Sequence, residues 1–280
     1  MPPRNPTRRN RNIGTAKRGH GRNNRLKIPS VGHGRHAFWE RISEARQVKR
    51  LVSSKELRFF VERTRTDCVY ACTVDDIVRF MSYVPVADWQ ELHAIVLRQP
   101  HRKQQTLSAV WGRLDYAMEL VDERGRELYT GPAIILEAIN PNEPIKFGKS
   151  LSIDATAEFE RLKSDGHHVR VGSKNNTLES TLESCRATQL YRTLPHELGH
   201  WVDFLTKVEY RAGIGASAEE YEQLLERFHA RPDREREDFA HSYALKLSQK
   251  LYAAAAAPFP RQINRDQVLE DGLRWEDFSL

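Results

Sequence analysis

Cysteine and long apolar runs are both scarce in this sequence. Its three cysteines, Cys68, Cys72 and Cys185, are too few for a disulfide framework, and the first two lack the second pair that a zinc ribbon requires. No stretch approaches the ~18 consecutive apolar residues that a membrane-spanning helix needs. We therefore expect a protein of the reducing cytoplasm that has no membrane-spanning helix.

Acidic residues are absent from the first 39 positions, which hold ten of the 44 lysines and arginines. The rest of the chain combines 34 basic with 38 acidic residues, so a basic tail precedes a mildly acidic body. Residues 1–36 are also poor in apolar side chains, so little burial offsets the entropy that ordering them would cost. We expect these residues to form a disordered basic tail.

Two roles for this tail stay open. It is either a solubilising extension or a segment that attracts nucleic acid or another polyanion through its positive charges. Residues 1–36 contain no aromatic side chain that would stack on bases, so any such binding is expected to be nonspecific.

The rest of the chain is long enough for one sizeable core, so no metal is needed merely to hold the fold together. Residues 37–66 interleave charged with apolar side chains, and we expect a helical arm or linker docked on the body. Residues 67–255 are expected to form the main domain. Residues 256–280 follow an alanine run and include two prolines, which favours a loose C-terminal extension.

Within the main domain, Thr73 is typical of an N-cap and precedes a helical pattern that stops before Pro85. Apolar runs predict strands at residues 92–97, 107–114, 116–121 and 133–139. A short helix over 154–163 and an edge strand over 168–171 follow, and helical spacing dominates from residue 178. These patterns predict an α+β fold with a small mixed sheet and C-terminal helices.

The sharpest chemical signal is the pentapeptide His196-Glu197-Leu198-Gly199-His200. Two histidines four residues apart on a helix project to one side and can bind a single zinc ion. Glu197 lies between them, where a general base contacts a metal-bound water without being a ligand. Zinc lowers the pKa of that water to about 7, and the carboxylate takes its proton during attack on a carbonyl.

The residues around this motif predict an amphipathic helix. An apolar stripe is formed by Leu190, Leu194, Leu198, Val202 and Leu205, so the helix has a core side. Asp203 is expected on the histidine side, either accepting the second N–H of an imidazole or as a solvated residue. Pro195 requires either that the helix begins near Thr193 or that a longer helix kinks there.

A catalytic zinc usually takes a third protein ligand, and several residues compete for this role. The metzincin pattern is excluded because Thr206 stands where its third histidine belongs. Glu237 borders an apolar stripe of a later helix and could point at the same metal. His229 and His241 are alternatives, and Glu237 could instead be an acid that the helix dipole favours at an N-terminus.

His196 to Asp203, followed 37 residues after His200 by Glu237-Asp238-Phe239-Ala240, resembles the zincin metallopeptidases with a glutamate ligand, the gluzincins. The pattern is most similar to the protease domain of anthrax lethal factor and to the Pro-Pro endopeptidases. The resemblance implies Zn²⁺ on His196, His200 and Glu237, with Glu197 as the base. It also implies a strand at the edge of a cleft that holds an extended peptide.

The sequence departs from these relatives at one position. They place an assisting tyrosine seven residues before the glutamate ligand, where this chain has Ala230. Tyr243, Tyr210 and His229 are the candidates for stabilising the oxyanion instead.

Two functions are therefore expected from the sequence. The first is a zinc-dependent endopeptidase that hydrolyses peptide bonds of a protein substrate. The alternative is a nucleic-acid-associated or regulatory protein that combines the basic tail with an inactive zincin-like body.

Overall fold

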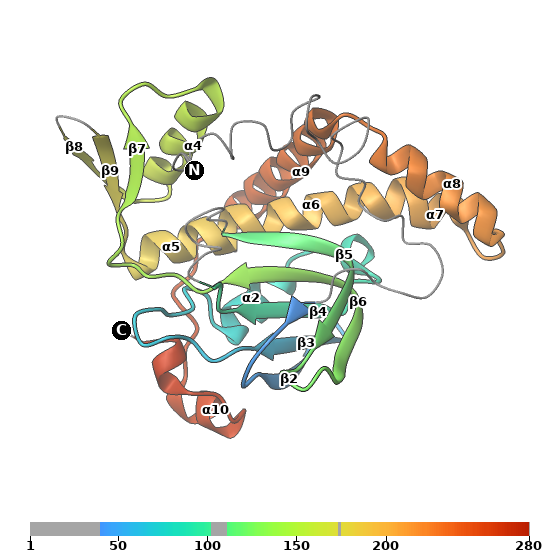
Figure 1. The fold of residues 1–280 in the computed structure, drawn as a ribbon, viewed down its shortest axis with the longest axis horizontal. Helices are drawn as coiled ribbons and strands as arrows, with labels where there is room; N and C mark the ends of the chain where they lie inside the picture. Colours follow the sequence, from blue (N-terminus) through green and yellow to red (C-terminus); the bar gives the residue numbers. More distant parts are fainter. Residues whose placement is uncertain (1–39, 102–110, 173–174, 280) are drawn as a thin grey trace, which may run out of the picture. The chain divides into compact units, whose positions relative to one another are not determined.

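The structure, a computed structural model, describes residues 40–101, 111–172 and 175–279. The expected disordered tail, residues 1–36, lies outside the described residues, as does the first half of the strand expected at 107–114. Residues 112–114 of that strand belong to β5. The fold is mixed α+β, with a mixed sheet followed by C-terminal helices, as the sequence patterns predict (Figure 1).

The larger sheet has six strands in the order β1-β5-β6-β4-β3-β2. Their bounds are Glu40–Arg41 for β1, Arg46–Val52 for β2, Lys55–Val61 for β3, Ala94–Arg98 for β4, Gly112–Val121 for β5 and Glu127–Glu137 for β6. β4 is parallel to both β3 and β6, whereas β2 and β5 run antiparallel to β3 and β6 respectively. The sheet is therefore mixed.

The prediction of a helical arm over residues 37–66 is wrong, because β2 and β3 form a hairpin within the main sheet. Alternate side chains of β3 are buried on one face, where Leu57, Phe59 and Val61 are at most 2% exposed. This period of two is that of a strand with a buried face. The turn between the strands is made by Ser53 and Ser54, both with positive φ, in place of the glycine or asparagine that usually marks such a turn.

A second sheet of three strands follows, with β7 (Ile145–Gly148), β9 (Asn175–Glu179) and β8 (His168–Val171) in that order. Helix α4 (Ile153–Ser164) supplies Phe159 and Leu162, which form a small core with Leu178 of β9. The short helix expected over 154–163 and the edge strand expected over 168–171 are thus confirmed. Figure 1 shows this small sheet near the beginning of α5.

The helices are α2 (Val74–Met81), α5 (Leu182–Thr188), α6 (Leu194–Phe204), α7 (Tyr210–Ala212), α8 (Ala218–His229), α9 (Asp233–Ala253) and α10 (Arg265–Glu270). Two short 3₁₀ helices are η1 (Val86–Trp89) and η4 (Trp275–Asp277). Two π-helical turns are η2 (Gln189–Thr193) and η3 (Leu205–Glu209). Thr73 caps α2 as expected, since its side chain accepts from the Asp76 amide.

Helix α6 follows directly from the π-helical turn η2, so Pro195 lies in its first turn. The amide of Leu194 donates to the Gln189 carbonyl, five residues back. Such a widened turn accommodates a proline ring that would otherwise clash with the preceding turn of an α-helix. The chain therefore passes from α5 into α6 without leaving helical geometry.

The apolar side of α6 packs on the large sheet. Leu190, Leu194, Leu198 and Leu205 of the expected stripe are all buried, whereas Val202 is half-buried. Trp201 and Phe204 fill the core instead and stack with ring centroids 5.5 Å apart. The face of α6 that packs on the sheet is therefore slightly different from the one that the leucine spacing indicates.

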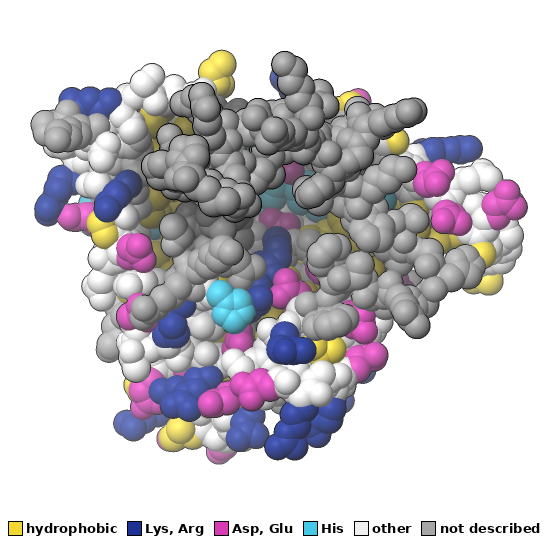
Figure 2. Space-filling view, viewed as in Figure 1, with side chains coloured by type: hydrophobic (Ala, Val, Ile, Leu, Met, Phe, Trp, Pro, Cys, Tyr) yellow, Lys and Arg dark blue, Asp and Glu magenta, His cyan; other side chains and the backbone are white. Residues whose placement is uncertain are grey.

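Exposed charges on the β2–β3 hairpin and its flanks are paired with neighbours of opposite sign. The pairs are Lys49 with Glu56, Arg58 with Glu56, Arg63 with Glu44, and Arg65 with Asp67. Figure 2 shows basic and acidic side chains intermingled on the lower part of this face. Such exposed pairs contribute little to stability, because water and salt screen the attraction between their charges.

The prediction of a loose extension over residues 256–280 is also wrong. Phe259, Val268, Leu273 and Phe278 are buried in the same core as the large sheet and α6. The amide of Tyr70 donates to the Asp277 carbonyl at 2.8 Å, which fastens the end of the chain to the start of the main domain. The described part of the C-terminal segment therefore belongs to this domain.

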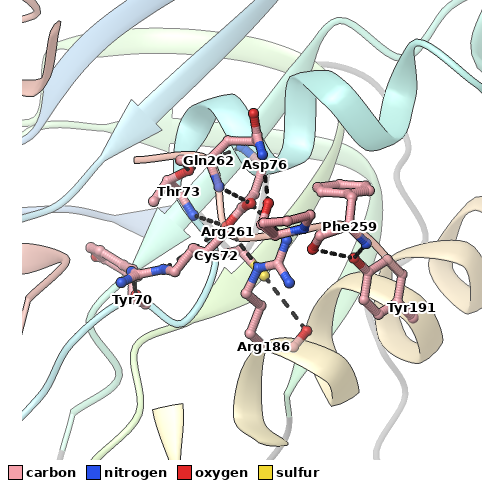
Figure 3. Close-up of polar contacts among 10 residues, drawn as sticks. Tyr70, Cys72, Thr73, Asp76, Arg186, Tyr191, Phe259, Arg261 and Gln262 are labelled. Atoms are coloured by element: carbon pink, nitrogen blue, oxygen red, sulfur yellow. Dashed lines mark hydrogen bonds and ion pairs between the residues drawn. The ribbon is translucent and has the colours of Figure 1, made fainter. Parts of the chain in front are cut away.

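A buried carboxylate joins this segment to two helices (Figure 3). Asp76 of α2 is fully buried and accepts from the Arg186 guanidinium of α5 at 2.8 and 3.0 Å. The same carboxylate accepts from the Gln262 amide at 2.8 Å, and Arg261 donates to the Phe278 carbonyl. Because a buried charge without partners is costly, these contacts fix three distant segments together.

No helix among the described residues is long and apolar enough to span a membrane.

His167 offers a test of this packing. It is 3% exposed, and its ring nitrogens lie 3.0 Å from the hydroxyls of Ser180 and Thr188. Burial lowers the pKa of His167 below its ordinary value. The unfolded chain then binds a proton that the folded protein rejects, so stability is lost as the pH falls below about 6.5.

We expect the melting temperature to drop less steeply between about pH 7.5 and about pH 5.5 in His167→Gln than in the wild type. His168→Gln, at the exposed neighbouring position, is the control and should keep the wild-type slope. Equal slopes in all three proteins would contradict a neutral buried His167.

Candidate metal centre

Two imidazoles of α6 meet at their Nε2 atoms. His196 and His200 lie one turn apart, with side chains 17% and 14% exposed and Nε2 atoms 3.1 Å apart. The expected projection to one side of the helix is therefore present. The rings are nearly perpendicular, with centroids 4.7 Å apart, so both Nε2 atoms can face a common point.

Glu237 of α9 completes this group from a distant part of the sequence. Its Oε2 lies 3.2 Å from His196 Nε2, and its Oε1 lies 3.4 Å from His200 Nε2. Ligand atoms of these three residues all lie within 4.8 Å of one another. We call His196, His200 and Glu237 the His–Glu cluster.

A glycine allows the two helices to approach closely enough for this contact. A Cβ atom at Gly199 would lie 2.8 Å from both the Cα and the carbonyl oxygen of Ala240. These are backbone atoms of α9, so they have no flexible side chain that could move aside. Glu237 precedes Ala240 by three residues, about one turn of α9, and therefore faces the histidines.

The ligand atoms of the His–Glu cluster lie close enough together to share one zinc ion. Bonds of about 2.0–2.1 Å at tetrahedral angles place neighbouring ligand atoms about 3.3–3.4 Å apart. The two Nε2 atoms are 3.1 Å apart, and they lie 3.2 and 3.4 Å from different oxygens of the Glu237 carboxylate. Two imidazoles and a carboxylate are also the ligands that many catalytic zinc sites use, with the fourth position left for water.

The charges in the cluster favour an ionised carboxylate. Hydrogen bonds from His196 and His200 hold the pKa of Glu237 well below its ordinary value. The Nδ1 atom of His196 is buried and has no hydrogen-bond partner among the described residues. Its tautomer is therefore set by the group that Nε2 contacts rather than by a second hydrogen bond.

Glu197 has a different environment, although it is adjacent in sequence. Its carboxylate is buried, with the residue 8% exposed, and Oε2 accepts from the Leu114 amide of β5 at 2.8 Å. Burial raises the pKa of Glu197, which opposes the effect of the nearby histidines. A carboxylate with a raised pKa and one fixed hydrogen bond has the properties of a general base.

Asp203 does not contact the histidines in the way that its spacing indicates. The residue is fully buried, and its Oδ2 accepts from Arg231 Nη1 at 2.6 Å, while Oδ1 pairs with Lys207. Both oxygens are therefore engaged by cations instead of an imidazole N–H. The expectation of a direct hydrogen bond to a histidine is wrong, because α6 turns Asp203 toward the α8–α9 connection.

The expected oxyanion residues are held elsewhere. The Tyr243 hydroxyl donates to Asp88 at 2.8 Å, and the Tyr210 hydroxyl donates to the Ala87 carbonyl at 3.1 Å, so both reach the turn η1. Burial and the bond to Asp88 raise the pKa of Tyr243. His229 is not part of the His–Glu cluster, and its ring lies against Tyr116, with centroids 6.2 Å apart.

His241, the other alternative ligand, lies beside the cluster without joining it. Its ring is 4.4 Å from the ring of His196, measured between centroids. Its nitrogens are not among the ligand atoms that converge within 4.8 Å. Of the three candidates for the third position, the structure brings Glu237 to both imidazoles.

Two groups on β5 are not predicted from the sequence. The Leu114 amide holds Glu197, and the ring of Tyr116 packs between Phe204 and Phe228, with centroids 4.8 and 5.8 Å away. Side-chain alternation places Leu114 and Tyr116 on one face of the strand, but nothing local to β5 indicates which helix that face meets. The amide of Leu114 is a backbone group at the strand edge, for which side-chain alternation gives no signal.

No protein-family model, curated protein or solved structure matches this chain.

The contact at Gly199 can be tested by adding one methyl group. Gly199→Ala should push α9 away from α6, lower stability by about 1–3 kcal/mol and weaken zinc binding, because Glu237 moves with α9. Denaturant unfolding and a competitive zinc titration measure the two effects. Gly148→Ala is the control, since its Cβ would meet only the Ser150 carbonyl at 3.7 Å. Wild-type zinc affinity in Gly199→Ala would show that the close approach does not position Glu237.

Proposed function

We propose that this protein is a zinc-dependent endopeptidase of the zincin type, with a glutamate as the third ligand. The observation that carries this proposal is the His–Glu cluster, whose ligand atoms lie within 4.8 Å of one another and can share one zinc ion. A buried carboxylate, Glu197, lies directly beside the cluster without contributing to it. Together they supply a metal site and a separate base, as metal-assisted hydrolysis requires.

His196, His200 and Glu237 would hold the zinc, which when bound polarises a carbonyl and lowers the pKa of a coordinated water. Glu197 takes the proton of the attacking water and passes it to the leaving amine. The Leu114 amide holds one oxygen of Glu197 at 2.8 Å, and the other oxygen would take the proton. Burial supports both steps, because it brings the pKa of the carboxylate closer to neutrality.

The edge of β5 favours a polypeptide as the substrate. Among the described residues, β1 pairs with the outer edge of β5 only at Leu120 and Val121. Residues 112–116 therefore present backbone groups next to Glu197, which already accepts from one of them. An extended peptide can add to such an edge through main-chain hydrogen bonds, which are independent of its sequence.

The alternative, a polyanion-binding protein with an inactive body, stays a prediction about the tail. The ten basic residues on which it rests lie in positions 1–39, outside the described residues.

Metal binding is the first test of the proposal. Purified protein should contain about one zinc per chain by elemental analysis, with X-ray absorption showing about two nitrogen ligands and oxygen. Glu237→Gln and His196→Ala should lose most of this zinc. Glu197→Gln should retain it, because a glutamine carbonyl can still accept from the Leu114 amide.

The zinc content of these variants distinguishes a residue that ligates the metal from one that acts as the base. Zinc loss in Glu197→Gln would place Glu197 among the ligands and overturn its role as a base. Full zinc content in Glu237→Gln would remove Glu237 from the site. In either case, circular dichroism establishes whether the variant is folded.

Hydrolysis is the second test. Incubation with a peptide library, followed by mass spectrometry, should show new termini that depend on zinc and vanish with a chelator. Glu197→Gln should cut by about 10²- to 10⁴-fold less, which is typical of losing a general base. Cleavage that persists unchanged in this variant would belong to a contaminating protease, and the proposal would then rest on metal binding alone.

A further inference from the structure

Asp203 combines complete burial with proximity to the metal site. It follows His200 by three residues on α6 and is fully buried. A buried carboxylate is costly unless cations compensate it, and here Arg231 and Lys207 each engage one oxygen. Lys207 follows four residues later on the same helical run, and its ammonium also lies over the Phe239 ring of α9, 5.0 Å from the centroid. The pair with Arg231 links α6 to the residues that precede α9.

Arg231 lies in the three-residue connection between α8, which ends at His229, and α9, which begins at Asp233. Its guanidinium donates to Asp203 at 2.6 Å and packs over the buried ring of Phe228 at 5.5 Å. The next residue, Pro232, precedes the first residue of α9. The start of α9 is therefore held against α6 by Asp203.

Glu237 follows Arg231 by six residues and lies in the first turns of α9. A helix moves nearly as a rigid body over this length, so a shift of its start displaces the Glu237 carboxylate. The contact of Gly199 with Ala240 sets how closely the helices approach. Contacts at Ala240 and Tyr243 hold α9 on the C-terminal side of Glu237. The contact of Asp203 with Arg231 holds the chain on the N-terminal side, so Glu237 lies between fixed points.

We propose that Asp203 is a positioning residue for the metal ligand Glu237 and that it acts through Arg231. This inference rests on the proposed zinc site. It assigns the carboxylate a role on the third ligand, which comes from another helix, instead of on the imidazoles of its own helix. Outer residues that orient a ligand typically change metal affinity about 10- to 100-fold when they are replaced.

The test measures the zinc dissociation constant of the full chain by competition with a chromophoric chelator. Asp203→Asn and Arg231→Gln should each weaken zinc binding by about tenfold or more. Arg231→Gln keeps Lys207 beside Asp203, so it serves where Asp203→Asn folds poorly. The double variant should bind zinc no more weakly than whichever single variant binds it more weakly, because both substitutions break the same contact between Asp203 and Arg231.

A matched control separates positioning from general stability. Asp76 is also fully buried and paired with an arginine, Arg186, but in the network that joins α2, α5 and the C-terminal segment. Asp76→Asn should lower the melting temperature of the metal-free protein and leave zinc affinity unchanged. Equal losses of zinc affinity in Asp76→Asn and Asp203→Asn would overturn the inference.

The Glu237→Gln background shows which ligand is affected. With Glu237 unable to ligate as a carboxylate, adding Asp203→Asn should cause no further loss of the remaining affinity. A further loss there would mean that Asp203 acts on the histidines, which would overturn the route through Arg231. If the wild type binds zinc and the variants bind it equally well, only this inference is overturned. If the wild type binds no zinc, the proposed function is overturned as well.

Discussion

The close contact of two helix backbones at Gly199 is the constraint on which the candidate metal site depends. A single added Cβ would lie 2.8 Å from Ala240 backbone atoms, so only glycine permits the observed separation of α6 and α9. At that separation, a carboxylate on α9 lies 3.2 and 3.4 Å from two imidazoles on α6. The histidine pair is set by one helix, but the third ligand exists only through this packing. The glycine inside the pentapeptide is thus as important to the site as the histidines beside it.

Three buried carboxylates show how the same functional group is adapted to different tasks. Asp76 and Asp203 are each compensated by arginine, and both join segments that are distant in sequence. Glu197 has instead one backbone amide and the neighbouring histidines, and burial raises its pKa. A carboxylate paired with arginine is a poor base, because the nearby positive charge opposes the binding of a proton. The absence of such a cation beside Glu197 among the described residues is therefore what suits it to proton transfer.

Several helices and strands could be predicted from short sequence patterns. The elements that could not be predicted have physical reasons in common. Thr73 capped a helix as expected, and α4 and β8 lie where local spacing placed them. The hairpin of β2 and β3 is not apparent from local patterns. Arg46 and Arg50 share a face with Val48 and Val52, while Leu51 and Phe60 lie on the other face, which obscures the period of two. Ser53-Ser54 is also an unusual turn. The order of the C-terminal segment cannot be predicted from local patterns, because its anchors, such as the Gln262 amide on Asp76, are contacts with residues far away in the chain.

The residues of the candidate site also divide into those that local sequence predicts and those that depend on long-range packing. The geometry of His196, Glu197 and His200 follows from 3.6 residues per turn, which is a local property of one helix, and the pentapeptide was sufficient to anticipate it. The sequence favours Glu237 over His229 and His241 as the third ligand, through its neighbouring apolar stripe and the family resemblance, but the choice itself depends on the rotation of α9 against α6. The same holds for Asp203 and Tyr243, whose partners Arg231 and Asp88 come from other segments. Side-chain spacing reports which way a residue points on its own helix, whereas long-range packing determines what it meets there.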